Sequence, residues 1–256
     1  MKRYKLWEHF VAGEMYKRFF LLPNCAIIDT KKGARDMDVC ACGSNIPSEY
    51  CHKLKSGSLV ANLWHKLIML DAGLSAYDGF CKVGCHECCK EYFYVSAAEY
   101  FLMKNHLLCF NPSFFEEAKQ IGKEQLSLLA KSHTRELAKL IAPSDVVQSC
   151  ALLDRNTGYC SAYPARTLIC RLYGSSSLFA YCDEIRGHIM SMAKIPYNMD
   201  LTAGVDHFVG SNGKTVFQRP YPLLFWLAFD DAYTNMYDIA ISNPMTDYIA
   251  MLEEDI

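Results

Sequence analysis

The sequence predicts a mainly α-helical protein with one short β-hairpin, an α+β arrangement centred on a cysteine-rich metal site. Three observations support this class. Two capping-box signatures precede helical stretches between residues 96 and 142. A polar turn separates two short apolar runs within 150–163, as in a hairpin. Two clusters of cysteines lie on either side of the helical stretches, which suggests that the fold brings the clusters together.

Composition limits the classes of function. The chain has 256 residues, of which 51% are hydrophobic, enough for one large domain or a core domain with a small appendage. Its net charge of -2 gives no electrostatic reason to expect a nucleic acid or an anionic membrane as partner. Charged residues interrupt the first 22 residues, so they lack the apolar core of a secretory signal. No apolar run reaches the length of about 18 residues needed for a membrane span. We therefore expect a cytoplasmic protein.

The N-terminal part predicts a helix followed by a small loop-rich module. Apolar positions over residues 5–22 recur at helical spacing and stop before Pro23. Residues 31–57 are rich in Gly, Ser, Lys and Cys and show little periodicity. We expect a boundary here, with one domain over 1–57 and a second over 58–256.

The second domain begins with helical patterns. A helix is expected over 58–74, followed by a loop with the first cysteine cluster and the short β-prone run 92–95. Ser96 and Glu99 have capping-box spacing and predict a helix through about residue 106. Ser113 and Glu116 repeat that spacing ahead of a long amphipathic helix that ends before residue 143.

The second cysteine cluster predicts a hairpin. The turn 155–158 separates CALLD from YCSAY, so Cys150 and Cys160 lie near the two outer ends. Pro164 suits the first position of a helical turn, which would place Arg166 and Cys170 on one face. The remainder is expected to be mainly helical, with a loop over 204–216, a turn at 210–213 within it, and a last helix after residue 244.

The seven clustered cysteines are the strongest functional signal. They are Cys81, Cys85, Cys88 and Cys89, then Cys150, Cys160 and Cys170. Thiolates suit zinc or iron-sulfur centres, and two adjacent cysteines rarely fill one apolar hole together. One zinc or one four-iron cluster takes about four thiolates, so seven exceed one centre. The surplus indicates a second metal, spare thiols beside a cluster, or buried neutral cysteines.

Cations near these cysteines would offset the negative charge of a thiolate site and tune the metal. Arg166 and Arg171 lie within one helical turn of Cys170, and the planar guanidinium group suits such a fixed role. Disulfides are a poor explanation, because the total of 13 cysteines is odd, the chain is large and no export signal is visible.

The motif F-C-x3-C-x2-C-C, with C-x-L-L-D, G-x-C-x-x-Y-x-x-R and C-R after it, resembles the YkgJ-type cysteine-cluster family. This family is also described as the CxxCxxCC, zinc- or iron-chelating domain. The resemblance covers about residues 80–174 and implies metal chelation by these cysteines without implying a reaction. Ala151 and Thr167 stand where a proline often follows the cysteine and the arginine. Neither change removes a ligand.

A second motif lies in the N-terminal module. Cys40, Cys42, Cys51 and His52 lie within thirteen residues, so four N/S ligands could close a tetrahedron around zinc without the rest of the chain. The motif is similar to the SEC-C zinc motif, which implies a structural zinc. The six residues 45–50, NIPSEY, replace the basic residues that usually lie between the second and third ligands of that motif.

Two other functions compete with simple metal binding. The C-x3-C-x2-C spacing of CKVGCHEC is that of radical SAM enzymes, and flagellin lysine N-methylases resemble the cysteine-cluster family. An iron-sulfur enzyme with redox or protein-lysine methylation activity is therefore one alternative. No nucleophile and base can be paired by spacing, so the sequence assigns no reaction. The other alternative is a zinc-stabilised interaction adaptor, whose partner protein would contact the aromatic-rich residues 217–237.

Overall fold

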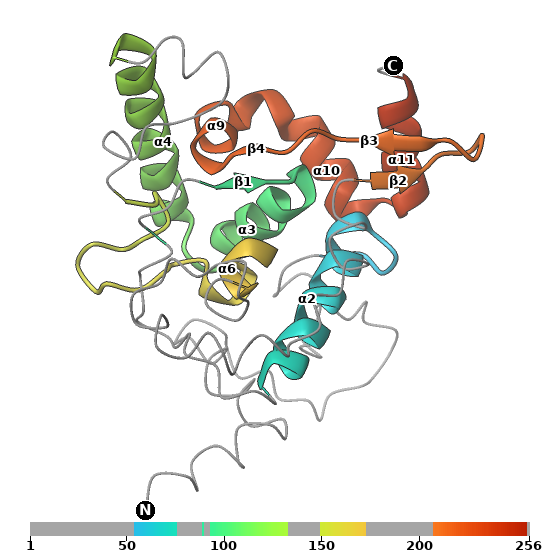
Figure 1. Cartoon of the computed structure of the whole chain (residues 1–256), viewed down its shortest axis with the longest axis horizontal. Coiled ribbons are helices and arrows are strands. Elements are labelled where there is room, and N and C mark those ends of the chain that lie inside the picture. Colours follow the sequence, from blue (N-terminus) through green and yellow to red (C-terminus); the bar gives the residue numbers. More distant parts are fainter. Residues whose placement is uncertain (1–53, 76–88, 90–92, 133–148, 173–206, 255–256) are drawn as a thin grey trace, which may run out of the picture.

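The computed structural model describes residues 54–75, 89, 93–132, 149–172 and 207–254, and this part is mainly helical (Figure 1). The elements are α2 Leu59–Ser75, β1 Tyr94–Val95, α3 Ala97–Phe110, α4 Pro112–Ser132, η4 Tyr163–Ala165, α6 Leu168–Leu172, β2 His207–Val209, β3 Thr215–Phe217, β4 Tyr221–Pro222, α9 Leu223–Ala228, η6 Asp230–Tyr233, α10 Thr234–Ser242 and α11 Met245–Glu254. The predicted class, mainly α with a small β component, is confirmed.

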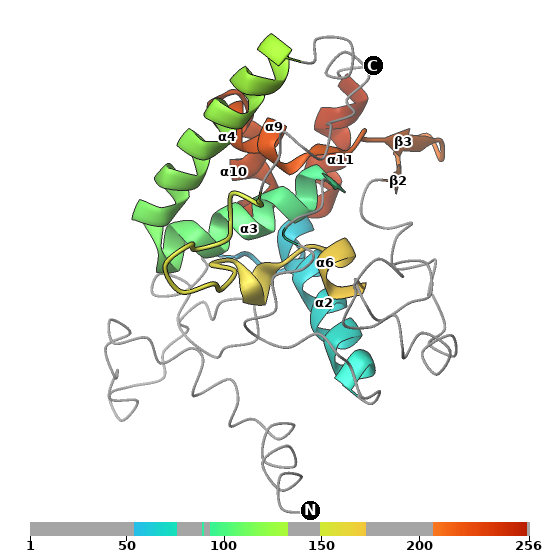
Figure 2. The same cartoon turned by 60° about the vertical axis from the view of Figure 1, so that its left-hand side comes forward.

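Helix α3 is the centre of this part of the fold. It packs against α2, α4, α9 and α10, and Figure 2 shows it between α4 and α2. Every residue from Ala97 to Leu107 is buried, including four polar ones. A helix that is covered on all sides needs no apolar stripe. The polar side chains on α3 must instead find partners inside the protein.

The start of α3 follows the predicted capping box. The Ser96 side chain accepts a hydrogen bond from the Glu99 backbone N–H at 3.2 Å, and the Ser96 N–H donates to Glu99 Oε2 at 2.9 Å. The helix continues to Phe110, beyond the expected end near residue 106. Packing of its last turn, including Leu107 in the core, accounts for the extra length.

The predicted capping box at Ser113 is wrong. Helix α4 begins at Pro112, so Ser113 already lies inside it. Asn111 caps the helix instead, because its Oδ1 accepts a hydrogen bond from the Phe114 N–H at 3.4 Å. Proline at the first helical position loses no intrahelical hydrogen bond, and asparagine is among the best capping residues.

Helix α4 lies directly on α9, with a glycine at the point of closest approach. A Cβ added to Gly122 would lie 2.8 Å from Leu227 Cβ and 3.2 Å from the Leu224 carbonyl oxygen. Trp226 of α9 is fully buried, and its ring stacks on Tyr100 of α3 with centroids 5.6 Å apart. These contacts join α3, α4 and α9 into one core.

Two antiparallel strand pairs complete the described part. β1 pairs with β4, which is more than a hundred residues later in the chain, with Tyr94 opposite Pro222. β2 and β3 form a hairpin, so the loop expected over 204–216 is wrong for residues 207–209 and 215–216, which are strands. Phe208 and Val216 face each other on the buried side, and this period-two alternation is typical of strands. The predicted turn at 210–213 is confirmed, and the N–H of Gly210 donates to the Lys214 carbonyl at 2.8 Å.

Helices expected near both ends of the described part are confirmed. α2 covers the stretch predicted over 58–74, and α11 begins directly after Pro244. The Lys55 N–H donates to the Ile241 carbonyl, and the Met245 N–H donates to the Gly57 carbonyl, so the chain before α2 contacts α10 and α11. The division into domains at residue 57 stays a prediction.

Several predictions fall outside the described residues. They concern the helix over 5–22, the zinc-motif residues Cys40, Cys42, Cys51 and His52, and the first-cluster residues Cys81, Cys85 and Cys88. In the part that is described, none of the helices has both the length and the apolar character that a membrane crossing requires.

The stretch 217–237, which would contact a partner in the adaptor alternative, is partly core and partly exposed. Within 217–237, Leu223, Leu224, Trp226 and Leu227 are buried. Only some of its large apolar side chains, such as those of Phe217 and Phe229, are exposed. The aromatic residues here mainly hold the protein together, as the stacked and tilted ring pairs around Trp226 show.

Candidate metal centre

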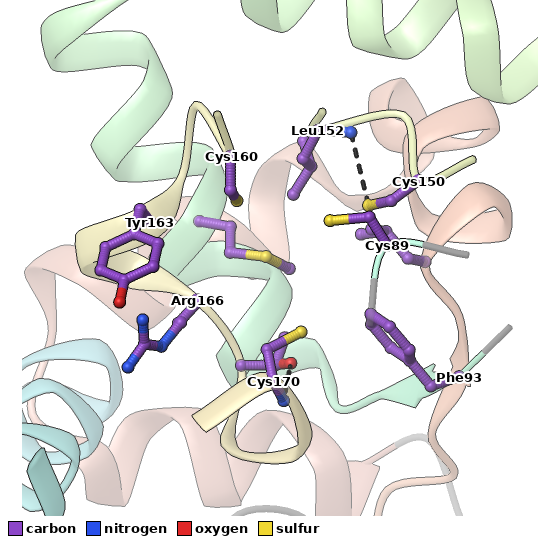
Figure 3. Close-up of a pocket in the computed structure, with 11 residues that line it drawn as sticks. Cys89, Phe93, Cys150, Leu152, Cys160, Tyr163, Arg166 and Cys170 are labelled. Carbon is purple, nitrogen blue, oxygen red and sulfur yellow. Dashed lines mark hydrogen bonds between the residues drawn. The ribbon is translucent and has the colours of Figure 1, made fainter. Parts of the chain in front are cut away.

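Four of the seven clustered cysteines line one pocket. The thiols of Cys89, Cys150, Cys160 and Cys170 point into it from different sides (Figure 3). Its volume is about 30 Å³, enough for one water-sized occupant. The other lining residues are Phe93, Met103, Leu152, Tyr163, Arg166, Thr167 and Leu223. A pocket with several thiols, apolar walls and one cation is chemically distinct from ordinary core.

A backbone hydrogen bond joins the two cysteine clusters directly. The N–H of Cys150 donates to the Cys89 carbonyl oxygen at 2.6 Å, although α3 and α4 separate these residues in the sequence. The N–H of Leu152 points at the Cys150 sulfur at 3.4 Å. An N–H donor of this kind stabilises a thiolate and tunes a bound metal. The structure thus places Cys89 of the first cluster beside Cys150 of the second.

These thiols share a pocket without forming a closed ligand set. Within the residues that the structure describes, no three Cys, His, Asp or Glu side chains come close enough together to hold a metal ion. Cys89, Cys150, Cys160 and Cys170 are thiols and not disulfides. A complete set would need movement of these side chains or further cysteines from the first cluster.

The predicted hairpin that carries Cys150 and Cys160 is present, but it is short. Leu153 and Cys160 form a single antiparallel bridge, and the Ser161 N–H donates to the Leu152 carbonyl at 2.9 Å. Gly158 has φ of +72°, a backbone conformation that side chains with a Cβ rarely adopt. The turn therefore brings the two cysteines to the same pocket.

Cys170 lies on the short helix α6, which starts differently from the prediction. Arg166 ends η4 in an extended conformation, so it does not share a helical face with Cys170. Two separate short helices replace the single turn because Thr167 caps the second one: its Oγ1 accepts a hydrogen bond from the Cys170 N–H at 3.4 Å. Thr167 is one of the two residues that stand where a proline is expected, and its hydroxyl has a structural role here.

Arg166 supplies the positive charge of the pocket. Its guanidinium carbon lies 4.1 Å from the centroid of the Tyr163 ring, in cation-π geometry. Its Nη2 is 3.7 Å from Asp71 Oδ1 on α2. These contacts hold the cation beside the thiols, where it can offset the charge of bound thiolates.

Arg171 has a different role from Arg166. Its side chain is buried, forms an ion pair with Asp71, and donates to the carbonyl oxygens of Pro164 at 2.6 Å and Arg166 at 3.0 Å. Burial lowers the pKa of Arg171, and the Asp71 carboxylate opposes this shift. Arg171 therefore fastens the segment with Tyr163 and Arg166 to α2.

Sequence reasoning missed several residues that build this pocket. Met103 of α3 and Leu223 at the start of α9 line it, and no local motif marks either of them. Glu99 was recognised only as a helix cap, although its second carboxylate oxygen reaches α6. Cys109, on α3, is partly buried and is not among the residues that line the pocket.

Comparison with known proteins supports a metal-binding class. Residues 80–188 match the family model CxxCxxCC, described as "Putative zinc- or iron-chelating domain". This range contains all seven clustered cysteines. No curated protein and no solved structure matches the chain. This part of the chain is thus similar to a domain described as zinc- or iron-chelating, which supports metal binding in general.

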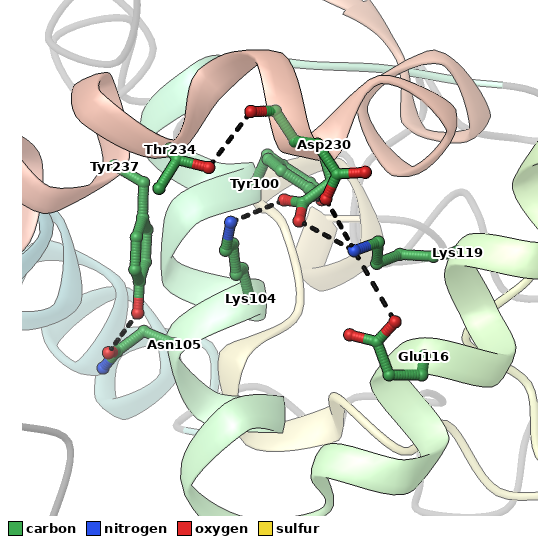
Figure 4. A network of polar contacts seen from close by, with 9 residues as sticks. Tyr100, Lys104, Asn105, Glu116, Lys119, Asp230, Thr234 and Tyr237 are labelled. Atoms are coloured by element: carbon green, nitrogen blue, oxygen red, sulfur yellow. Dashed lines mark hydrogen bonds and ion pairs between the residues drawn. The ribbon is translucent and has the colours of Figure 1, made fainter.

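A second group of buried polar residues lies between α3, α4 and η6 (Figure 4). Asp230 Oδ1 accepts hydrogen bonds from Tyr100 and Lys104, each at 2.7 Å. Lys119 Nζ lies 3.4 Å from Asp230 Oδ2 and 3.0 Å from Asp231 Oδ1. The ammonium of Lys104 is also 4.5 Å from the Tyr237 ring centroid. This cluster is a structural ion-pair network that joins three elements.

Three buried tyrosines predict a loss of stability in alkali. Burial raises the pKa of Tyr100, Tyr237 and Tyr248 above the ordinary value of 10.0, and the Asp230 charge raises that of Tyr100 further. The unfolded chain therefore releases these protons first, so the free energy of unfolding should fall as pH rises above 10.0. Urea denaturation at increasing pH measures this. The Tyr248→Phe variant should show a smaller decrease, and an equal decrease would contradict the assignment.

Proposed function

We propose that this protein is a metal-binding protein whose central site holds its metal through cysteine thiolates of both clusters. One observation carries the proposal: Cys89 of the first cluster and Cys150, Cys160 and Cys170 of the second line the same pocket. Cys81, Cys85 and Cys88, from the same short segment as Cys89, are proposed to complete the ligand set.

The donor atoms of the pocket favour thiophilic metals. Among the described lining residues the candidate ligands are four thiols and the Met103 thioether, with neither a carboxylate nor an imidazole. Hard cations such as calcium and magnesium prefer oxygen ligands, whereas zinc and iron-sulfur centres take thiolates. The family match to a zinc- or iron-chelating domain agrees with this chemistry.

Zinc is our first candidate for the central site. One zinc ion takes about four thiolates, and four of the described cysteines line this pocket. Four thiolates around Zn²⁺ would leave a net charge of about -2, which Arg166 partly offsets. An iron-sulfur cluster is the second candidate, because seven thiols exceed the need of one zinc ion. We also propose a structural zinc at Cys40, Cys42, Cys51 and His52, and a cytoplasmic location.

Metal analysis of the anaerobically purified protein tests this proposal. We expect about two zinc ions per chain, one at each site, and no visible absorption, because zinc is d¹⁰. The Cys42→Ser variant should lose one zinc and leave the central one in place. Iron with visible absorption would instead select the iron-sulfur candidate. A protein that holds neither metal would contradict the proposed function.

A further inference from the structure

The buried carboxylate of Glu99 links the start of α3 to the start of α6. Its Oε2 accepts hydrogen bonds from the Ser96 N–H and the Ser96 hydroxyl, both at 2.9 Å. Its Oε1 accepts a hydrogen bond from the Leu168 N–H at 2.8 Å. The capping box uses only Oε2, so the bond to Leu168 is additional. Leu168 is the first residue of α6 and lies two residues before Cys170.

Burial of the Glu99 carboxylate costs free energy, and its hydrogen bonds to Ser96 and Leu168 offset that cost. Glu99 is 6% exposed, and an ionised carboxylate is tolerated in such a place only when it is well hydrogen-bonded. An exposed glutamate could close the same capping box at lower cost. The Leu168 N–H is one of the orphan donors at the start of a helix, and Glu99 satisfies it from another element.

Helix α6 is held by Leu168, which packs in the hydrophobic core, and by polar contacts at both of its ends. The helix has five residues, and Thr167 caps it locally through the Cys170 N–H. Arg171 fastens the other side to Asp71. Glu99 therefore supplies a hydrogen bond that ties the beginning of α6 to α3, the same helix that contributes Met103 to the pocket.

We infer that Glu99 is a positioning residue of the metal site: its carboxylate fixes α6 against α3 and so directs the Cys170 thiol into the pocket. This inference rests on the proposed function, since it concerns a ligand of that site. Outer residues that orient a ligand commonly change metal affinity by about 10- to 100-fold. We expect an effect of this size on zinc binding when the bond to Leu168 is lost.

A double-mutant cycle on the full chain tests the inference, with zinc affinity measured by competition with a chromophoric chelator. Glu99→Gln should lower zinc affinity by about 10- to 100-fold, because an amide has one acceptor oxygen and cannot serve both Ser96 and Leu168. In the Cys170→Ser background the same change should have no further effect, since the ligand that it positions is already gone.

Two control variants separate positioning from other effects. Ser96→Ala removes the hydroxyl of the capping box but leaves the bond from Leu168, so it should lower the thermal midpoint without changing zinc affinity. Glu116→Gln removes the same charge from an exposed position and should leave affinity unchanged. If Glu99→Gln does not fold, Glu99→Asp keeps the charge but shortens the reach to Leu168 and should give the same result.

The possible failures are distinguishable. Equal losses from Glu99→Gln in both backgrounds would overturn the positioning role while leaving Cys170 as a ligand. Unchanged zinc affinity in Cys170→Ser would remove Cys170 from the proposed ligand set, and the role of Glu99 with it. Equal effects of Ser96→Ala and Glu99→Gln on zinc affinity would reduce Glu99 to a helix cap.

Discussion

Replacing Asp230 with asparagine should lower the free energy of unfolding by about 3–5 kcal/mol, the range found when one partner of a buried ion pair is removed. Asp230 and Lys104 lie 2.7 Å apart, and their side chains are 5% and 6% exposed. Asparagine can still accept the Tyr100 hydrogen bond, but it leaves the Lys104 ammonium buried without its counter-charge. Urea denaturation measures this loss, provided that the dependence of the unfolding free energy on urea concentration is the same in the variant and the parent protein.

The neighbouring aspartate provides a matched control. Asp231 also pairs with Lys119, but its side chain is 77% exposed, so Asp231→Asn should lower the free energy of unfolding far less than Asp230→Asn. Lys104→Met combined with Asp230→Asn should recover part of the stability, because no unpaired buried charge remains. Similar losses in the two single asparagine variants would show that burial of the pair does not determine its contribution.

Serine in place of Cys150 or Cys160 should have the second large effect. Both thiols point into the pocket, and a hydroxyl is a poor ligand for a thiophilic metal. We expect metal affinity to fall more than the roughly 100-fold upper value for outer residues. Because binding and folding are coupled, the thermal midpoint of the metal-loaded protein should fall with it. Competition titration and thermal unfolding measure the two quantities.

Cys109 is the control for this experiment. It is a partly buried cysteine on α3 that does not line the pocket, so Cys109→Ser should retain full metal content. Unchanged metal content in Cys150→Ser or Cys160→Ser would remove that residue from the proposed ligand set. Loss of metal in Cys109→Ser would instead show that any buried thiol change disturbs the site indirectly.

Local signals in the sequence were sufficient for several helices. The Ser96–Glu99 capping box and the Asn243-Pro244 boundary each involve residues a few positions apart, and the structure confirms the helices α3 and α11 that follow. At the start of α4 the predicted capping box at Ser113 is wrong. Asn111 caps the helix and Pro112 occupies its first position, and these two favourable residues together set the start of α4 before Ser113.

Contacts between distant segments could not be predicted in the same way. The pairing of β1 with β4 depends on where the intervening helices place Tyr221, and the short strands carry little pattern of their own. Lys104 and Asp230 look like ordinary surface charges in the sequence, yet the packing of α3 against η6 buries both. Tertiary packing decides such cases, and spacing along the chain does not encode it.

The candidate site was predictable in its residue types but not in its construction. Cysteine spacing singled out the thiols that the pocket contains, and Arg166 was expected near them. The different roles of Arg166, which lines the pocket, and Arg171, which holds the segment to α2, were not expected, because both lie within one helical turn of Cys170. Only the burial of Arg171 and its backbone contacts separate its role from that of Arg166.

The hydrogen bond from Cys150 to the Cys89 carbonyl also bears on the order of folding. It closes a long stretch of chain that contains all of α3 and α4. Bringing the ends of a free coil of that length together costs conformational entropy, whereas packing α3 and α4 first shortens the gap to be closed. We therefore expect the pocket to form late in folding, after the two helices have docked. Filling it should mainly slow unfolding and leave the rate of folding almost unchanged.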